Sequence, residues 1–365
     1  MKFPKNADLW LPAYVRDRTR YLGRRTPAKR LWVAITDHYE PLGGDVSLAV
    51  AHARVGAWQR RWPTIAAAAP IDSDGRSPCY TFFYPQEDYE RDILESLAEM
   101  SRSGLTDVEV HIHHEGDTAS VFAEKIRTFC AVLREEHGLL HFHDEKLVFG
   151  FIHGNWALDN SRPDGLCCGV SGELQLLRDL GCYADFTMPS IPSPTQSRIL
   201  NQIYWTTGDP ARPRGFDQGV EVTVGGGVQG DLLMITGPTG LRYRDRLLPR
   251  LETGELAAYD PPTPYRVERW LDLAPRIGED IFVKLFTHGA REDNASALLG
   301  TAEKPGSLPS MFRWIQEAAQ RRDLELHWAS AYEMFCAADA LIQPVASREN
   351  VLNEGVRGVG GVASR

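Results

Sequence analysis

The stretch CYTFFYPQEDYERDILESLAEMSRSGLTDVEVHIHH (79–114) decides the fold class, because it contains a complete strand–helix–strand unit. Two apolar runs, CYTFFY (79–84) and DVEVHI (107–112), have the length and composition of buried strands. Between them we expect a helix that Gly104 ends. Its apolar stripe consists of Ile93, Leu94, Leu97 and Met100. Such a unit predicts neighbouring parallel strands joined by a crossover helix.

The same rhythm continues from residue 31 to about residue 345, which predicts one α/β domain over 31–345. Residues 192–262 interrupt it, because Gly and Pro are frequent there, and GVEVTVGGGVQGDLLMIT (219–236) predicts an inserted β-hairpin. The composition of residues 346–365 predicts a disordered tail. Further strands are expected at LWVAIT (31–36), LVFGFI (147–152), YADFTM (183–188), IFVKLFT (281–287) and LELHW (324–328).

Charge is distributed unevenly along the chain. Residues 1–30 carry nine Lys or Arg and two Asp, a balance of +7, so the total of −9 leaves −16 for the other residues. An acidic body argues against nucleic acid as the main partner, because phosphates bind to basic surfaces. The basic lead-in over 1–30 either makes a weak contact with an anionic membrane surface or remains a solvated arm.

Two further features concern the compartment. No apolar run approaches the roughly 18 to 20 residues that a membrane span needs, and the first residues contain no apolar secretory segment. The six cysteines lack C-x-x-C spacing. These features predict free thiols and a cytoplasmic location.

Histidines gather at the ends of the predicted strands. The strand-end positions are His38, the pair His113 and His114, His153, His288 and His327. Active sites of α/β barrels lie at the carboxyl ends of the strands, where the loops converge. We therefore expect most of these histidines to lie close together.

The strand DVEVHI gives the sharpest local signal. Alternation sends Val108, Val110 and Ile112 to one face and His111 and His113 to the other. Two imidazoles spaced in this way can bind one metal ion. Just beyond the strand, His114, Glu115 and Asp117 can supply or orient a further ligand.

Other strand ends carry groups suited to catalysis and to sugar binding. Asp37 and Glu40 can serve as ligand or general base beside a metal, and His288 can donate a proton. The segment FIHGNWALDNSR (151–162) combines an aromatic platform with polar edges, as a sugar ring requires. The expected substrate-binding residues are His153, Asn155, Trp156 and Arg162, with Trp156 as core filler the alternative.

The order of these motifs resembles the polysaccharide deacetylase (NodB-homology) family. The resemblance rests on TFFY (81–84) followed by SRSGLTDVEVHIHH (101–114), and on ITDHYEP (35–41), ELQLLRDLGCYADFTMPS (173–190) and VKLFTHG (283–289). It implies a distorted (β/α)7-type barrel of the deacetylase class. It also implies a divalent metal, usually Zn²⁺, and hydrolysis of an acetyl group on an acetylated sugar or polysaccharide precursor.

In the resemblance, Asp37 matches the catalytic base and His38 falls where the family has a metal-binding aspartate. His113 matches the first metal histidine, but Asp117 stands where the second is expected. His288 matches the late histidine that acts as general acid. With this departure, the expected set becomes Asp37 and His288 as catalytic residues, and His38, His111 and His113 as metal ligands.

Two alternatives remain open at this point. A glycosidase of a related barrel class would need two carboxylates on opposite sides of the scissile bond, and the candidates are Asp37, Glu40, Glu115 and Asp185. A catalytically inactive glycan-binding protein on the same scaffold would explain the loss of the family's aspartate pair. The density of histidines argues against it, since titratable groups concentrate at functional sites.

Overall fold

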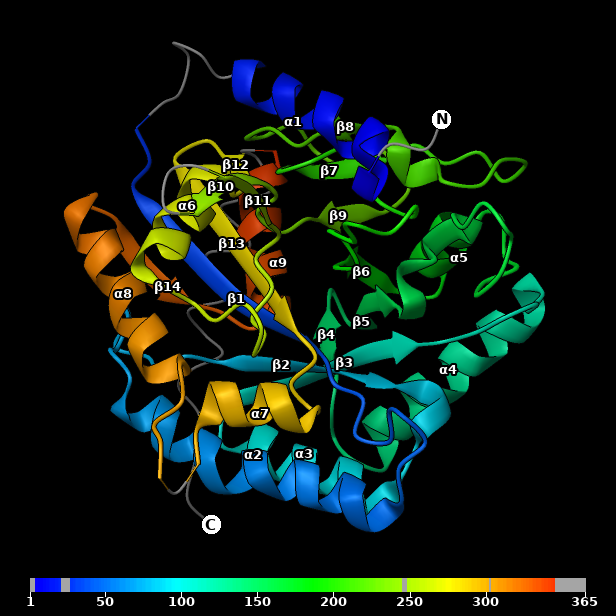
Figure 1. Cartoon of the computed structure of the whole chain (residues 1–365). Helices are drawn as coiled ribbons and strands as arrows, with labels where there is room; N and C mark the ends of the chain where they lie inside the picture. The colour runs from blue at the N-terminus through cyan, green and yellow to red at the C-terminus, as the bar shows by residue number, and fades with distance from the viewer. Residues whose placement is uncertain (1–3, 21–26, 245–247, 302, 345–365) are drawn as a thin grey trace.

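A mainly parallel sheet forms the centre of the computed structural model, which describes residues 4–20, 27–244, 248–301 and 303–344 (Figure 1). The strands pair in the order β12-β13-β1-β2-β3-β5-β6-β9-β7-β8, with β14 on β1 and β4 on β5. The parallel strands are β1 (Arg30–His38), β2 (Tyr80–Pro85), β3 (Thr106–Ile112), β5 (Lys146–His153), β6 (Cys182–Asp185), β9 (Leu233–Ile235), β13 (Asp280–Thr287) and β14 (Glu325–Trp328).

The antiparallel strands lie at the margins of this sheet. They are β4 (His141–His143), β7 (Ile203–Thr206), β8 (Gly219–Glu221) and β12 (Arg276–Ile277). A separate two-stranded sheet pairs β10 (Gly240–Arg244) with β11 (Leu248–Glu252). The α/β class and the predominance of parallel strands are thus confirmed.

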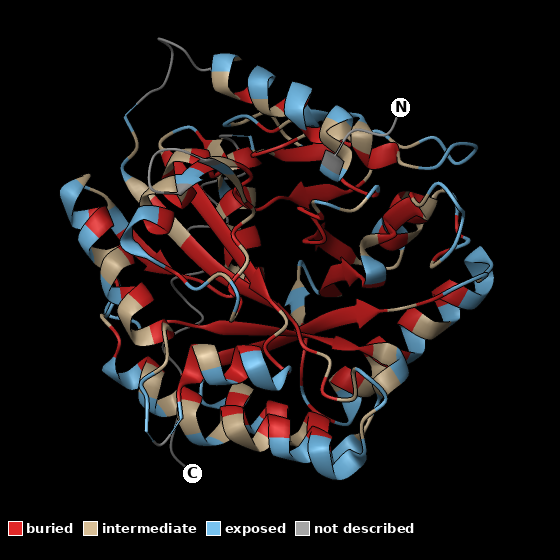
Figure 2. Cartoon of the chain, viewed as in Figure 1, coloured by how far each residue is buried: buried red, intermediate tan, exposed pale blue. Residues whose placement is uncertain are grey.

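Helices cover both faces of the sheet. One face packs against α2 (Leu48–Ala68), α3 (Arg91–Arg102), α4 (Ala119–Glu135), α6 (Pro264–Leu273) and α8 (Leu308–Arg321). The opposite face packs against α9 (Ala331–Ile342). The remaining helices are α1 (Ala7–Arg20), α5 (Glu173–Asp179) and α7 (Glu292–Leu299). Figure 2 shows that the strands are almost entirely buried, while the outer helices are exposed on their far sides.

The alternation of side chains along the strands decides where polar groups gather. In β3, Val108, Val110 and Ile112 contribute to the core beneath α2 and α3, as predicted. The predicted stripe of α3 packs into the same core. His111 lies on the opposite face of β3, as do Ala34 of β1 and Phe282 of β13 on their strands. By the same alternation, His38 and His111 lie on this side of the sheet.

The β-hairpin predicted over 219–236 is wrong in its pairing. Strand β7 lies between β8 and β9 and pairs antiparallel with both. The glycine-rich loop donates instead to the end of α9, through Gly225 N to Leu341 O and Gly227 N to Ile342 O, both at 2.8 Å. The hairpin of this region is β10–β11, further along the chain.

A buried side chain connects β13, near the first end of the strand order, to the segment that follows β6. Within the described residues, no strand ladder joins β12 or β13 to β8. Lys284 of β13 is buried and donates to the carbonyl oxygens of Phe186 and Met188, just beyond β6, at 2.6 and 2.7 Å. Complete closure of the sheet into a barrel stays a prediction.

The termini and the cysteines complete the description. Within the predicted basic lead-in, residues 7–20 form α1, which lies beside β7 and β8 in Figure 1 and buries Trp10, Ala13 and Asp17. The predicted tail over 346–365 lies outside the described residues. All six cysteines are free thiols. No helix in the described ranges has the length and apolar character needed to cross a bilayer.

Candidate metal centre at the strand ends

Five polar residues gather where β1, β3 and β13 end. The strands lie in register so that Asp37 pairs with Thr287 of β13, while Pro85 of β2 pairs with His111. The ring of His38 lies 4.8 Å from that of His288 and 5.3 Å from that of His111, between centroids, and the His111 and His113 rings lie 4.6 Å apart. Together with Glu40, these four histidines form what we call the open cluster.

Glu40 occupies the middle of the open cluster. Its Oε1 lies 3.3 Å from Nε2 of His111 and 3.5 Å from Nε2 of His113. Glu40 also has a ligand atom within 4.8 Å of His38 and His288. Ligand atoms held about 2.1 Å from one tetrahedral zinc ion lie about 3.4 Å apart. The spacing around Glu40 therefore fits a metal ion bound by Glu40, His111 and His113.

The outer nitrogen of each ring is held by an acceptor, which turns Nε2 toward Glu40. His111 Nδ1 lies 2.9 Å from the carbonyl oxygen of Ile152, and His113 Nδ1 lies 2.5 Å from Oε1 of Glu87. Since a carbonyl and a carboxylate can only accept, both Nδ1 atoms carry the proton. Metal-binding histidines are oriented in this way by carbonyl and carboxylate partners.

Electrostatics favour positive charge in the open cluster. Burial alone would raise the pKa of Glu40, but hydrogen bonds with His111 and His113 hold it well below its usual range. Burial lowers the pKa of His113, but the bonds with Glu40 and Glu87 outweigh this effect and raise it to about 10. In the absence of a metal, a proton on His113 balances the carboxylates, and a divalent cation competes for the same place.

The cluster has a buried side and an exposed side. The His38 and His111 side chains are buried, whereas those of Glu40 and His113 keep 26% and 31% of their exposure. Burial lowers the pKa of His38 well below its usual value, and also lowers that of His288. Both are therefore neutral imidazoles at neutral pH. A metal bound here would face solvent, as in catalytic zinc sites that keep one coordination position open.

Asp37 lies behind the open cluster and both its oxygens are engaged. Oδ1 accepts from Gly289 N at 2.7 Å, and Oδ2 accepts from the hydroxyl of Tyr80 at 2.8 Å. Burial raises its pKa to about 8, although these two bonds oppose the shift. A Cβ at position 289 would come within 2.2 Å of Oδ2. Asp37 thus fixes the turn that carries His288.

The four predicted substrate-binding residues are placed apart from one another. Trp156 lies beside the open cluster, with its ring 6.4 Å from that of His38 and 6.1 Å from that of His288. Asn155 is exposed, and Arg162 pairs with Asp164. His153 is buried and faces His114 in a separate group. Trp156 is therefore the one that the structure brings to the predicted metal ligands.

The expected convergence fails for His327. Strand β14 pairs with the beginning of β1, where His327 lies opposite Trp32, six residues before His38. At about 3.3 Å per residue, this places it roughly 20 Å from the strand end. His327 stacks on Trp32 and bonds to Asp74 instead. A strand-end histidine can join the site only if its strand extends as far along the sheet as the neighbouring strands do.

Sequence reasoning missed Glu87 and left Glu40 outside the expected ligand set. Both stand shortly beyond a predicted strand, Glu40 four residues after the run 31–36 and Glu87 three residues after the run 79–84. Position relative to the strand end was thus an available signal for both. No protein-family model matches the chain, and no curated protein shows significant similarity to it.

Proposed function

We propose that the chain is a metal-dependent hydrolase that removes an acetyl group from an acetylated sugar or polysaccharide precursor. The observation that carries the proposal is the convergence of Nε2 of His111, Nε2 of His113 and Oε1 of Glu40 on the exposed side of the strand ends. A divalent ion such as Zn²⁺ in this position would polarise the acetyl carbonyl and lower the pKa of water.

In this proposal, the residues around the metal ligands transfer protons, position the proton-transferring group and contact the substrate. His288 is a neutral and mostly buried imidazole beside Glu40, and in this proposal it accepts a proton from the attacking water and returns it to the leaving amine or alkoxide. Asp37 positions His288 through the Gly289 N–H, which replaces the role of general base expected from the resemblance. Trp156 offers an apolar surface to the sugar ring.

The proposed fold is a distorted barrel of the deacetylase class. Its support is the run of parallel strands from β13 through β1, β2, β3 and β5 to β6, and the Lys284 side chain that connects β13 to the residues after β6. In this proposal, side-chain bonds rather than a backbone ladder complete the closure.

Metal stoichiometry tests the proposal. We expect His113→Ala and Glu40→Gln each to remove one equivalent of bound zinc from the purified chain, measured by elemental analysis after dialysis. His52→Ala, which changes an exposed histidine on α2, is the control. Unchanged zinc content in both variants would refute the proposed centre.

Product analysis tests the reaction. We expect the wild-type chain to release acetate from a panel of acetylated glycans, and the two ligand variants to release none. Release of reducing sugar instead would indicate the glycosidase alternative. Two of its candidate carboxylates, Asp37 and Asp185, are buried and accept hydrogen bonds from neighbouring groups, which disfavours that reading. Chelator-insensitive glycan binding without turnover would indicate a binding protein.

A further inference from the structure

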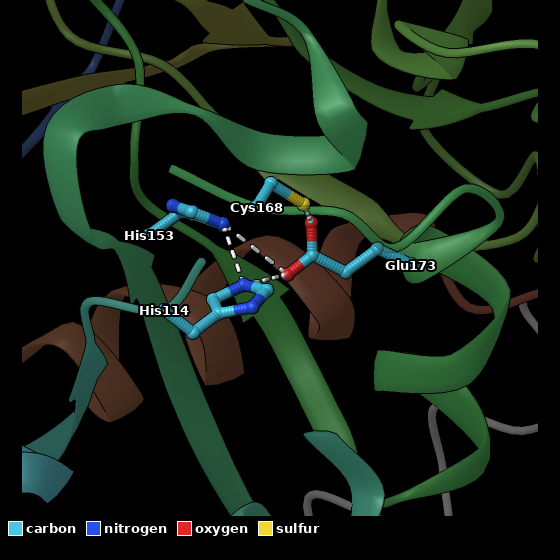
Figure 3. A group of neighbouring side chains, drawn as sticks. All are labelled: His114, His153, Cys168 and Glu173. Carbon is cyan, nitrogen blue, oxygen red and sulfur yellow. Dashed lines mark hydrogen bonds and ion pairs between the residues drawn. The ribbon is translucent and has the colours of Figure 1, made fainter. Parts of the chain in front are cut away.

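A second group of metal-ligating side chains lies apart from the open cluster. His114 follows β3, His153 ends β5, Cys168 lies in the loop after β5, and Glu173 begins α5 (Figure 3). We call this group the closed cluster, because all four residues are buried and the side chains of His114, His153 and Glu173 have no exposed surface. His113 and His114 are adjacent in the chain, yet they belong to different clusters.

Three ligand atoms of the closed cluster converge on one point. Nε2 of His114 lies 2.9 Å from Nε2 of His153, and these atoms lie 3.4 and 3.5 Å from Oε1 of Glu173. The two longer distances match the spacing of about 3.4 Å around a tetrahedral zinc ion. Sγ of Cys168 completes the group, with all four ligand atoms within 4.8 Å of one another.

The proton on the His153 ring points away from this centre. His153 Nδ1 lies 2.5 Å from the carbonyl oxygen of Gly154, so it is the donor and Nε2 carries a lone pair. His114 Nδ1 is buried 3.3 Å from Oδ2 of Asp117 and has no hydrogen-bond partner in the described ranges. In the tautomer protonated at Nδ1, its Nε2 also carries a lone pair. With neutral rings, two nitrogen lone pairs and a carboxylate oxygen then face one another.

The carboxylate of Glu173 is left with one unsatisfied oxygen. Oε2 accepts from the backbone N–H of Asp159 at 2.5 Å. Oε1 receives no hydrogen bond from any residue in the described ranges, although it is fully buried. No Lys or Arg of the described residues forms an ion pair with Glu173, and its nearest polar neighbours are the rings of His114 and His153. A buried carboxylate without a counter-charge is costly, so a cation at the centre would stabilise it.

The thiol of Cys168 lies 3.6 Å from Oε2 of Glu173, and burial together with this carboxylate raises the pKa of the thiol above its usual value. Backbone N–H groups oppose this effect. Sγ of Cys168 accepts backbone N–H bonds from Asn160 at 3.3 Å and from Val170 at 3.4 Å. Hydrogen bonds of this type to sulfur tune metal–thiolate centres. A divalent cation would deprotonate the thiol. Its two charges would then be balanced by one thiolate and one carboxylate, with two neutral imidazoles as the other ligands.

We propose that His114, His153, Cys168 and Glu173 bind a structural zinc ion. Four protein ligands without solvent access are typical of structural sites, in contrast to the exposed open cluster. The ligands come from three separate segments, so the ion would fasten the 154–173 loop to the ends of β3 and β5. This loop carries Trp156, which lies beside the open cluster.

Cobalt substitution tests the thiolate ligand directly. We expect the Co²⁺-loaded full chain to show the near-ultraviolet charge-transfer absorption of a cobalt–thiolate bond, and Cys168→Ser to abolish it. Cys167→Ser, which changes the adjacent and less buried thiol, should leave the band intact. Absence of the band in the wild type, or its survival in Cys168→Ser, overturns the proposal.

Zinc stoichiometry and thermal unfolding separate this site from the open cluster. We expect one equivalent of zinc to persist in His113→Ala and to be lost when Glu173→Gln is added. A strong chelator should lower the Tm of the His113→Ala chain, and zinc should restore it. If a proton on His114 holds the cluster instead, neither the zinc content nor the Tm responds, and the proposal fails even if the open cluster binds metal.

Discussion

Glu87 is not among the side chains that converge on Glu40, but it sets the orientation of one of them. Both of its oxygens lie 3.1 Å from the backbone N–H of His113, and Oε1 also accepts the ring proton of that residue. The ring cannot turn without breaking the bond between Nδ1 and Oε1, and the backbone bonds hold the Glu87 carboxylate in place. An acidic residue that no ligand spacing would single out therefore controls a proposed ligand.

We expect Glu87→Ala to weaken zinc binding at the open cluster by about 10–100-fold, the usual cost of removing a residue that orients a ligand. Competition with a chromophoric chelator measures the Kd. Glu90→Gln changes a nearby carboxylate that forms no capping bond and should leave the Kd unchanged. An equal Kd for Glu87→Ala and wild type would show that Glu87 does not orient the ligand.

Gly289 is required because its backbone approaches Asp37 closely. A Cβ there would come within 2.2 Å of Asp37 Oδ2 and 2.8 Å of the Trp58 ring. We expect Gly289→Ala to lower the free energy of unfolding by about 1–3 kcal/mol, as overpacking does, measured by urea denaturation. Gly56→Ala in α2 meets only the flexible Arg60 guanidinium and should be neutral or stabilising. Equal stability of the two variants would contradict the steric argument.

At the scale of elements, Lys284 connects β13 to the segment after β6, and this connection depends on pH. Burial lowers the pKa of Lys284 from 10.5 to about 7. Between these values the unfolded chain binds one proton more than the folded chain. The contribution of Lys284 to stability is therefore complete above pH 10.5 and is lost as the pH falls toward 7.

Lys284→Met should remove this dependence and leave two carbonyl oxygens without their donor. We expect the variant to be less stable than wild type, with a deficit that grows from pH 7 to pH 9 by up to about 1.4 kcal/mol per pH unit. Urea denaturation at each pH measures the difference. A deficit that is constant across this range would mean that Lys284 is charged in the folded chain throughout.

The β10–β11 hairpin is joined to α6 by a buried ion pair. Glu252 of β11 accepts from Arg266 through both oxygens, at 2.7 and 2.9 Å, and from the Trp270 indole at 2.9 Å. We expect Glu252→Gln to cost about 3–5 kcal/mol, because it removes the fully buried carboxylate that pairs with the guanidinium groups of both Arg266 and Arg242. Glu268→Gln breaks a more exposed pair with Arg321 and Arg322 and should cost less than about 1 kcal/mol. Chemical denaturation compares them, and similar losses would contradict this reading.

The strands that are buried on both faces could be predicted from the sequence, because each one is a single apolar run. The runs at 31–36, 107–112, 147–152 and 281–287 lie within strands, and the run at 79–84 begins one residue before β2. The pairing of β8 and β9 was not predictable in this way. Their common neighbour β7 precedes both of them in the chain, and alternation does not indicate which strand lies beside which.

For the whole molecule, the prediction that strand-end histidines converge holds only for strands that end at the same edge of the sheet. His38, His111 and His288 meet because β1, β3 and β13 end together, whereas β14 ends too early for His327. Cys168 and Glu173 had no such signal. They lie in a loop and at a helix start, and only the tertiary fold brings them to His114 and His153.

Helix α1 packs the N-terminal segment against the rest of the molecule through a small hydrophobic cluster. Trp10 packs with Ala13 and Leu200 and is 6% exposed, whereas Leu11 is 40% exposed. We expect Trp10→Ala to cost about 3 kcal/mol, the lower end for a buried Trp because this cluster is small. Leu11→Ala should change stability by less than about 0.5 kcal/mol. Thermal or urea unfolding decides, and equal effects would mean that α1 does not stabilise the fold.

The division of His113 and His114 between two clusters has a consequence for how this chain can vary. One peptide bond separates a residue of the exposed centre from a residue of the buried one, so the position of each ring depends on the exact length of the chain after β3. A single inserted or deleted residue there would misplace both rings at once. Point substitutions at 113 or 114 would damage one cluster each. Natural variants of this segment should therefore differ by substitution and keep its length.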